Sequence, residues 1–208
     1  MRVVITGASR GIGAALAASY RARGEEVIGT TRKEVDFGQP ARIEAWAKDV
    51  RDPVDLLICN AGVFLDRGQS LDTGYPAPLW AEAFAVNVTG VFLGIQGLLP
   101  QLRAAPAAKI AIISSQLGSQ ERATGGSYIY RASKAAVLNL GRNLAADLRS
   151  EGIAVGIYHP GWVRTDMGGS SAAISVEESA ASLLQRFDHL SLATTGCFEN
   201  WDGRPHAF

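Results

Sequence analysis

Residues 2–13 read Arg2-Val3-Val4-Ile5-Thr6-Gly7-Ala8-Ser9-Arg10-Gly11-Ile12-Gly13, a short apolar run followed by a turn with three glycines. The run is typical of a buried strand, and the helical spacing of Leu16 and Tyr20 follows the turn, with Gly24 as a stop. Glycines at such a junction let the backbone approach a phosphate at the helix N-terminus. We therefore predict a dinucleotide-binding turn. The spacing G-x-x-x-G-x-G departs from the usual G-x-G-x-x-G fingerprint, and a glycine-rich loop without a ligand is the alternative.

Four further apolar runs are short enough to be strands: residues 27–30, 54–60, 109–115 and 153–159. Helical patterns alternate with the runs, over residues 11–23, 79–103, 128–148 and 176–187. Pro100 is expected to kink or end the second of these helices. Apolar strands that alternate with helices are typical of a parallel sheet covered on both faces. We predict one α/β domain over residues 1–208, a Rossmann-like doubly wound parallel sheet. Its pocket is expected among loops 65–78, 116–124 and 166–175 at the carboxyl edge.

The composition narrows the class of protein. The chain of 208 residues is 47% hydrophobic, enough for one sizeable core. Twenty Lys and Arg residues balance twenty Asp and Glu residues without a basic run, so nucleic-acid binding is not expected. The apolar runs fall short of the roughly 20 residues that span a bilayer, so no membrane segment is expected. Because the chain enters its first strand at once, we expect no signal peptide and predict a cytoplasmic protein.

The two cysteines, Cys59 and Cys197, are too few and too far apart for a disulfide framework or a metal cluster. Cys59 also lies inside an apolar run. We predict two buried, reduced thiols and no metal site.

The stretch Tyr130-Arg131-Ala132-Ser133-Lys134 places a phenol and an ammonium one helical turn apart. The helical rise sets their Cα atoms roughly 6 Å apart on one face. A nearby cation favours the phenolate, so the sequence predicts a lowered pKa for Tyr130 and a role in proton transfer. Tyr128 also precedes the lysine, but only Tyr130 stands four residues before Lys134, so the helix geometry selects Tyr130. On its own the pair also fits a tyrosine packed under an extended lysine.

Four motifs now lie in order along the chain: Gly7-x-x-x-Gly11-x-Gly13, Asn60-Ala61-Gly62, Ser115 at a strand end, and Tyr130-x-x-x-Lys134. Together they resemble the short-chain dehydrogenase/reductase family over nearly the whole chain. Residues 126–134 and 160–167 resemble the branch that contains the C-factor signalling protein and the Sniffer-type carbonyl reductases.

The resemblance implies a catalytic set. Tyr130 would be the general acid/base, and Lys134 would lower its pKa and bind the nicotinamide ribose. Ser115 would hold the substrate oxygen, with the adjacent Ser114 as the alternative. Asn87 would hold a water in a proton relay, and its alternative is a helix asparagine bonded to backbone.

The resemblance also implies a set of cofactor-binding residues: Gly7, Ser9, Arg10, Gly11, Ile12, Gly13, Thr31, Arg32, Asp36, Asn60, Ala61, Gly62, Tyr130, Lys134, Pro160, Gly161, Val163 and Thr165. The second strand ends in Thr30-Thr31-Arg32-Lys33, without the acidic residue that holds the ribose of NAD. Arginine at this place favours the 2′-phosphate of NADP, and Arg10 would approach it from the other side. We therefore expect NADP(H) in preference to NAD(H), with two solvated arginines as the alternative.

The region after the second strand departs from the family. The resemblance implies a helix before the third strand, yet only Lys33 and Glu34 separate Arg32 from the strand-like triplet Val35-Asp36-Phe37. A parallel crossover needs about a dozen residues. We therefore expect this helix to be absent and one sheet edge to be trimmed, which leaves the adenine contact of Asp36 open.

The leading hypothesis is an NADPH-dependent reductase or dehydrogenase of small carbonyl or alcohol substrates. The first alternative is an NAD(P)-binding signalling or regulatory protein with little turnover, and the second is a nucleotide-sugar epimerase or dehydratase. A homodimer or homotetramer is also possible, because the small residues within Gly90-Val91-Phe92-Leu93-Gly94 suit either a helix pair or the core.

Overall fold

The computed structural model describes residues 1–208 and contains one six-stranded parallel sheet, with strand order β2-β1-β3-β4-β5-β6. The strands are β1 (Arg2–Ile5), β2 (Glu26–Gly29), β3 (Leu56–Cys59), β4 (Lys109–Ile113), β5 (Ala154–His159) and β6 (Phe198–Asn200). The five predicted strands are confirmed. Strand β6 was not predicted, because its three residues include the polar Glu199 and Asn200 and carry no strand pattern.

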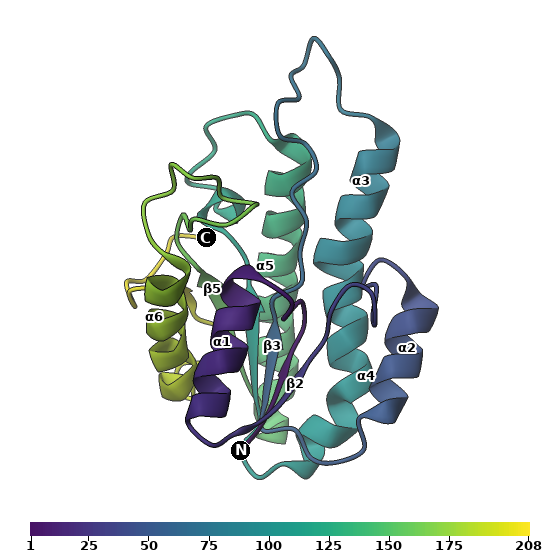
Figure 1. The fold of residues 1–208 in the computed structure, drawn as a ribbon, viewed down its shortest axis with the longest axis vertical. Coiled ribbons are helices and arrows are strands. Elements are labelled where there is room, and N and C mark those ends of the chain that lie inside the picture. The colour runs from purple at the N-terminus through teal and green to yellow at the C-terminus, as the bar shows by residue number, and fades with distance from the viewer.

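Helices cover both faces of the sheet, which confirms the doubly wound architecture (Figure 1). On one face lie α1 (Gly11–Ala22) and α6 (Val176–His189), and their buried residues share a cluster with Val3, Ile5 and Ile58. On the other face lie α2 (Pro40–Asp49), α4 (Gly90–Ala104) and α5 (Tyr128–Leu148). The chain turns from β2 back across β1 to β3, so the carboxyl ends of β1 and β3 form the crevice where such sheets bind ligands.

The predicted absence of a helix between the second and third strands is wrong, because α2 occupies that crossover. The triplet Val35-Asp36-Phe37 forms no strand; it belongs to the loop that leads into α2, and Val35 and Phe37 are buried there. The third strand of the sheet is β3, far enough along the chain to leave room for a helix. The trimmed edge is confirmed, since β2 is the last strand on that side. The hydrophobic pattern did not indicate this helix, because α2 buries only Ile43 and Ala47.

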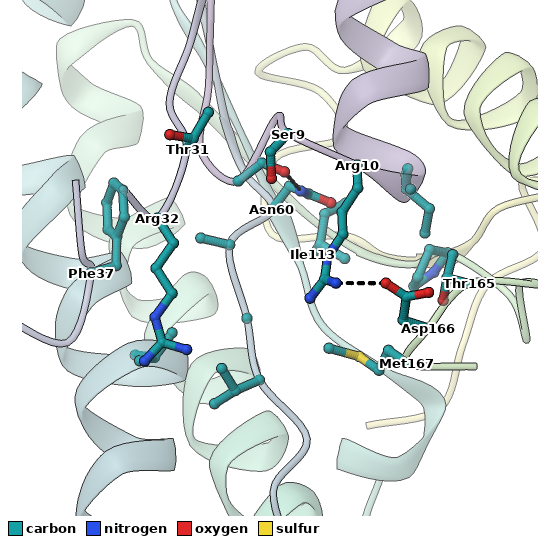
Figure 2. A pocket seen from close by; sticks show the side chains of 18 of the residues that line it. Ser9, Arg10, Thr31, Arg32, Phe37, Asn60, Ile113, Thr165, Asp166 and Met167 are labelled. Carbon is teal, nitrogen blue, oxygen red and sulfur yellow. Dashed lines mark hydrogen bonds and ion pairs between the residues drawn. The ribbon is translucent and has the colours of Figure 1, made fainter. Parts of the chain in front are cut away.

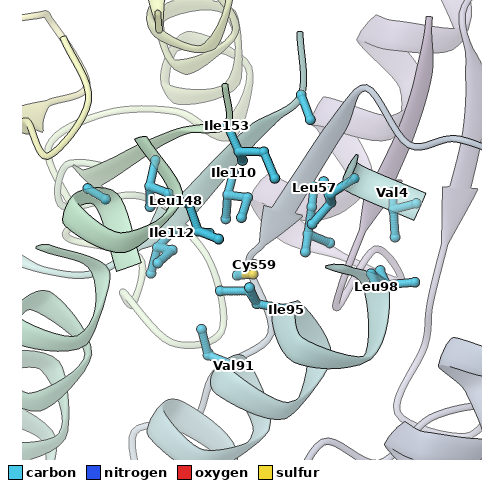
Figure 3. Close-up of a cluster of buried hydrophobic side chains, with 14 of the residues drawn as sticks. Val4, Leu57, Cys59, Val91, Ile95, Leu98, Ile110, Ile112, Leu148 and Ile153 are labelled. Atoms are coloured by element: carbon cyan, nitrogen blue, oxygen red, sulfur yellow. The ribbon is translucent and has the colours of Figure 1, made fainter. Parts of the chain in front are cut away.

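The larger core cluster fills the space between one face of the sheet and the helices α4 and α5 (Figure 3). It includes Leu57, Ile95 and Ile110, all fully buried. Cys59 lies in this core as a free thiol, as predicted. Cys197 is also free but only partly buried, because it precedes the short edge strand β6.

One helical stretch, Ala77–Ala104, is long and apolar enough to cross a membrane by length and composition alone, with a mean hydropathy of 1.5. It consists of α3 (Ala77–Phe84), the π-helical segment η1 (Ala85–Thr89) and α4. Its inner face belongs to the core, since Val91, Ile95, Leu98 and Leu102 are buried against the sheet. Packing against the sheet therefore accounts for the apolar residues of this inner face. The helix continues past Pro100 to Ala104, so this proline does not end it, and a kink there stays a prediction.

Candidate active site

A cavity of about 430 Å³ opens at the carboxyl edge of the sheet, at the crevice described above (Figure 2). Fifteen of the predicted residues lie on its wall: Gly7, Ser9, Arg10, Gly11, Ile12, Thr31, Arg32, Asp36, Asn60, Ala61, Gly62, Tyr130, Lys134, Pro160 and Thr165. Five predicted residues do not reach the wall: Gly13, Asn87, Ser115, Gly161 and Val163. Residues far apart in the sequence therefore meet at one site.

The glycine turn between β1 and α1 is shaped to approach a ligand with its backbone. Gly7 and Gly11 have φ of 69° and 55°, the left-handed region that favours glycine. A Cβ on Gly13 would lie 2.4 Å from the carbonyl oxygen of Gly7 and 2.5 Å from Nδ2 of Asn60, so this third glycine is required by packing. No side chain caps the first turn of α1 and no acidic residue lies in it. Its N–H groups and positive dipole end suit a phosphate.

The Asn60-Ala61-Gly62 segment ties the glycine turn to the end of β3. Nδ2 of Asn60 donates to the carbonyl oxygens of Thr6 and Gly7, at 3.1 and 3.0 Å. The hydroxyl of Thr6 accepts from the backbone N–H groups of Asn60 and Ala61, both at 3.0 Å. A Cβ on Gly7 would lie 2.9 Å from Cα of Ala61, so the two segments are in close backbone contact. These bonds hold the wall of the cavity in place.

Tyr130 and Lys134 lie one turn apart on α5, both buried, with Nζ of Lys134 5.7 Å from the Tyr130 ring centroid. Burial raises the pKa of Tyr130 to about 12, a hydrogen bond with Ser115 opposes this rise, and the charge of Asp66 adds to it. Burial also lowers the pKa of Lys134 to about 8. The sequence predicts a lowered pKa for Tyr130, and in the structure the direction is reversed. Nζ of Lys134 donates to the carbonyl oxygen of Ile113 at 3.0 Å, and desolvation of the phenol dominates.

The two adjacent serines at the end of β4 face different partners. The hydroxyl of Ser114 donates to the carbonyl oxygen of Lys134 at 3.0 Å and is 1% exposed. The hydroxyl of Ser115 accepts from the N–H of Leu117 at 3.1 Å, and its hydrogen bonding lowers the pKa of the Tyr130 phenol. Ser114 therefore holds α5 to the end of β4, and Ser115 caps the turn that follows the strand.

Asn87 lies in η1, and π-helical segments are common at functional sites. Its Oδ1 accepts from the N–H of Val63 at 2.8 Å, and its Nδ2 donates to the carbonyl oxygen of Val63 at 2.9 Å and to Oγ of Ser133 at 3.0 Å. Asn87 is fully buried. The side chain joins the β3 extension to α5, and both of its Nδ2 donors are in use within the protein.

Arg10 and Arg32 lie on the cavity wall, each in an ion pair. Nη1 of Arg10 lies 2.5 Å from Oδ2 of Asp166 across the cavity mouth (Figure 2). Nη2 of Arg32 lies 3.4 Å from Oε1 of Glu82, and its Nε lies 3.9 Å from Oδ2 of Asp36. Both guanidinium groups are at least 70% exposed. Exposed pairs contribute little, so a bound phosphate can replace these partners.

The segment after β5 completes the wall with Pro160 and Thr165. Gly161 has φ of 88°, and a Cβ there would lie 2.5 Å from Cδ1 of Ile174, so this residue shapes the turn from behind the wall. His159 is buried, and burial lowers its pKa to about 3. It is neutral at physiological pH and lies off the wall. Trp162 is 52% exposed and donates from its indole N–H to the carbonyl oxygen of Gly168 at 2.8 Å.

Several residues of the site carried no signal in the sequence. The ring of Phe64 stacks on Tyr130, with centroids 4.4 Å apart and an interplanar angle of 24°. Asp66 accepts from the backbone N–H of Tyr130. Ser114, the alternative to Ser115, lies on the wall, as do Asp166 and Met167 from the expected loop 166–175. The wall residues that were not predicted are Val35, Phe37, Val63, Val86, Ile113, Arg164 and Val176. Most are apolar, and only the tertiary fold distinguishes them from core residues.

Comparison with known proteins identifies the same architecture. The family described as short chain dehydrogenase matches residues 34–174. The C-signal protein of Myxococcus xanthus is 38% identical over 163 residues, which cover 77% of this chain and 97% of that protein. The structure of NADPH-bound carbonyl reductase from chicken fatty liver has a TM-score of 0.90 at 28% identity, covering 100% of this chain and 98% of that one. Carbonyl reductase Sniffer of D. melanogaster has a TM-score of 0.87 at 25% identity, covering 100% and 99%.

The sheet, the glycine turn and the buried tyrosine–lysine pair define a dinucleotide-binding α/β protein. The chain belongs to the short-chain dehydrogenase family of oxidoreductases. Its predicted likeness to the branch of the C-factor and Sniffer proteins is confirmed.

Proposed function

We propose that this protein is an NADPH-dependent reductase of small carbonyl substrates. The observation that carries the proposal is the buried phenol of Tyr130 on the cavity wall, with Ser115 and Lys134 beside it. Several structures of similar fold hold NADP or NADPH, which supports the choice of cofactor.

The cavity suits a dinucleotide. The glycine turn and the uncapped N-terminus of α1 would hold the pyrophosphate, and Arg10 and Arg32 would hold a 2′-phosphate. Lys134 would bond the nicotinamide ribose, and residues 160–165 would border the nicotinamide. When bound, NADPH supplies the hydride for the reduction.

The protein's own groups would supply the proton. A phenol whose pKa is about 12 is neutral at pH 7, so Tyr130 is in the form that donates a proton to a carbonyl oxygen. Ser115 would hold that oxygen beside the phenol. Asn87 would support the site by fixing Val63, because its side chain bonds both polar atoms of that residue's backbone.

The direction of the reaction should depend on pH. Alcohol oxidation needs the phenolate of Tyr130 as base, and the raised pKa makes this form scarce at neutral pH. Initial rates of oxidation are therefore expected to rise about tenfold per pH unit between pH 6 and 8, while reduction stays nearly constant. Paired pH profiles of kcat measure this. An oxidation profile that is flat over the range would contradict a neutral phenol.

Cofactor choice gives a second prediction. The two cofactors differ by one phosphate, and a well-formed charged hydrogen bond contributes about 1.5–3 kcal/mol. Replacing Arg10 and Arg32 together with Ala is expected to weaken NADPH binding by tens- to hundreds-fold, and NADH binding far less. Titration of both cofactors measures the difference, and Arg23→Ala is the control, since Arg23 follows the C-terminal end of α1 and pairs with Asp188. Equal losses for NADPH and NADH would show that the two arginines do not read the 2′-phosphate.

The proposed function itself is tested with a panel of aldehydes, ketones and quinones, following NADPH consumption by absorbance. Turnover of at least one substrate, absent in Tyr130→Phe, is expected. NADPH binding without turnover of any substrate would instead support the signalling alternative, which the similarity to C-signal suggests.

A further inference from the structure

Asp66, in the loop after β3, has a buried carboxylate that contacts the first turn of α5, the helix that carries Tyr130. It is 1% exposed and forms no ion pair. Its Oδ2 accepts from the backbone N–H of Ile129 at 2.8 Å, and both of its oxygens lie within 3.4 Å of the N–H of Tyr130. A buried charge is costly unless hydrogen bonds and a favourable dipole compensate it. Here the first turn of α5 supplies both.

The first turn of α5 has no other cap. Its N-cap residue, Ser127, makes no side-chain hydrogen bond to the helix. Ser127 also has φ of 44°, a conformation that costs free energy for a residue with a side chain. The N–H of Tyr130 therefore relies on Asp66, which comes from the loop after β3, 64 residues earlier in the chain.

The segment from Val63 to Asp66 is held firmly at its other end. Asn87 bonds the backbone of Val63 from η1 and also reaches α5 at Ser133. Between these two anchors, the ring of Phe64 stacks on the ring of Tyr130. One short segment thus contacts the catalytic tyrosine twice, through its ring and through its backbone.

We propose that Asp66 is a positioning residue, whose carboxylate fixes the first turn of α5 and thereby aims the phenol of Tyr130 at the substrate oxygen. This inference rests on the proposed function of the same site. Small errors in the placement of a proton donor cost a large part of the rate, whereas cofactor affinity depends on other parts of the wall.

The carboxylate also acts on the phenol through its charge. The groups that face Tyr130 are Lys134 from α5, Ser115 from the end of β4, and Asp66 from the loop after β3. The guanidinium of Arg67 lies over the ring of Phe64, 5.3 Å from its centroid, and Phe64 in turn stacks on Tyr130. Burial raises the pKa of Tyr130 most, Ser115 lowers it, and the charge of Asp66 raises it further. A neutral acceptor in place of Asp66 should keep the helix in position but lower the pKa of Tyr130.

Three variants test the inference. Asp66→Ala removes the cap and is expected to lower kcat about tenfold or more, with KM for NADPH within about twofold. Asp66→Asn keeps one oxygen acceptor, and a single oxygen is within 3.4 Å of both N–H groups, so it should restore most of kcat. Asp72→Asn, an exposed carboxylate in the same loop, is the control and should match the parent. Full kcat in Asp66→Ala, or no rescue by Asp66→Asn, would overturn the positioning role.

A second readout does not need turnover. With tyrosines labelled with ¹³C at Cζ, the Tyr130 resonance is assigned by its loss in Tyr130→Phe, and its pH titration gives the phenol pKa. Asp66→Asn is expected to lower this pKa relative to the parent, because the charge of Asp66 raises it. An unchanged pKa would overturn the electrostatic part. If no carbonyl is reduced by the parent protein, the proposed function fails, and this titration still decides whether Asp66 acts on Tyr130.

Discussion

Replacing Tyr130 with Phe is expected to lower kcat by about a thousandfold or more while the fold and NADPH affinity are kept. The change removes one hydroxyl and leaves the ring, which stacks on Phe64 at 4.4 Å. A positioned proton donor contributes about 10²- to 10⁴-fold to the rate, and the cavity wall has no second phenol to replace it. Turnover would be followed by NADPH absorbance, and affinity by NADPH fluorescence. A variant that keeps kcat within about tenfold of the parent would refute the role of Tyr130.

Tyr128→Phe is the matched control. Tyr128 is the first residue of α5, the helix that also carries Tyr130, and it is 37% exposed. Its ring packs edge-on against the ring of Tyr75. It lies off the cavity wall, so loss of its hydroxyl should leave most of the activity. Tyr128 and Tyr130 are only two residues apart, but the helical twist points their rings in different directions. Tyr130 lies on the cavity wall and Tyr128 does not.

The features that the sequence predicted well are local. The glycine turn follows from a strand, a turn and a helix that are consecutive in the chain, and the Tyr130–Lys134 pair follows from the pitch of one helix. The choice of Ser115 over Ser114 to hold the substrate oxygen rested on resemblance and stays a prediction, since Ser115 affects the pKa of Tyr130 but only Ser114 reaches the cavity wall.

The features that the sequence did not predict depend on distant contacts. Asp66 reads as a loop aspartate until the fold brings it to α5. The amide of Asn87 is bonded to Val63, which depends on the approach of η1 to the end of β3. The direction of the Tyr130 pKa was also beyond the sequence. Spacing gives the distance to a cation, but only tertiary packing gives the desolvation that outweighs it.

Replacing Lys134 is expected to weaken both NADPH affinity and kcat. Lys134 is 6% exposed, lies on the cavity wall, and donates to the carbonyl oxygen of Ile113. With a pKa of about 8 it is largely charged at pH 7. One ammonium would then serve the ribose and stand beside the phenol. Loss of a charged hydrogen bond of about 1.5–3 kcal/mol corresponds to a loss of NADPH affinity of roughly ten- to a hundredfold in Lys134→Ala.

Lys134→Met separates this role from a packing role, because it keeps most of the side-chain volume and removes the charge. A lysine whose pKa falls from 10.5 to about 8 on folding destabilises the fold fully below pH 8, and the penalty is relieved as the pH rises from 8 to 10.5. The cost at neutral pH is on the order of 3 kcal/mol, partly offset by the bond to Ile113. Lys134→Met is therefore expected to unfold at a higher temperature than the parent at pH 7, yet to bind NADPH weakly and turn over slowly. A variant that gains stability and keeps its NADPH affinity would remove the ribose role, whereas loss of both function and stability would mean that the lysine is mainly structural.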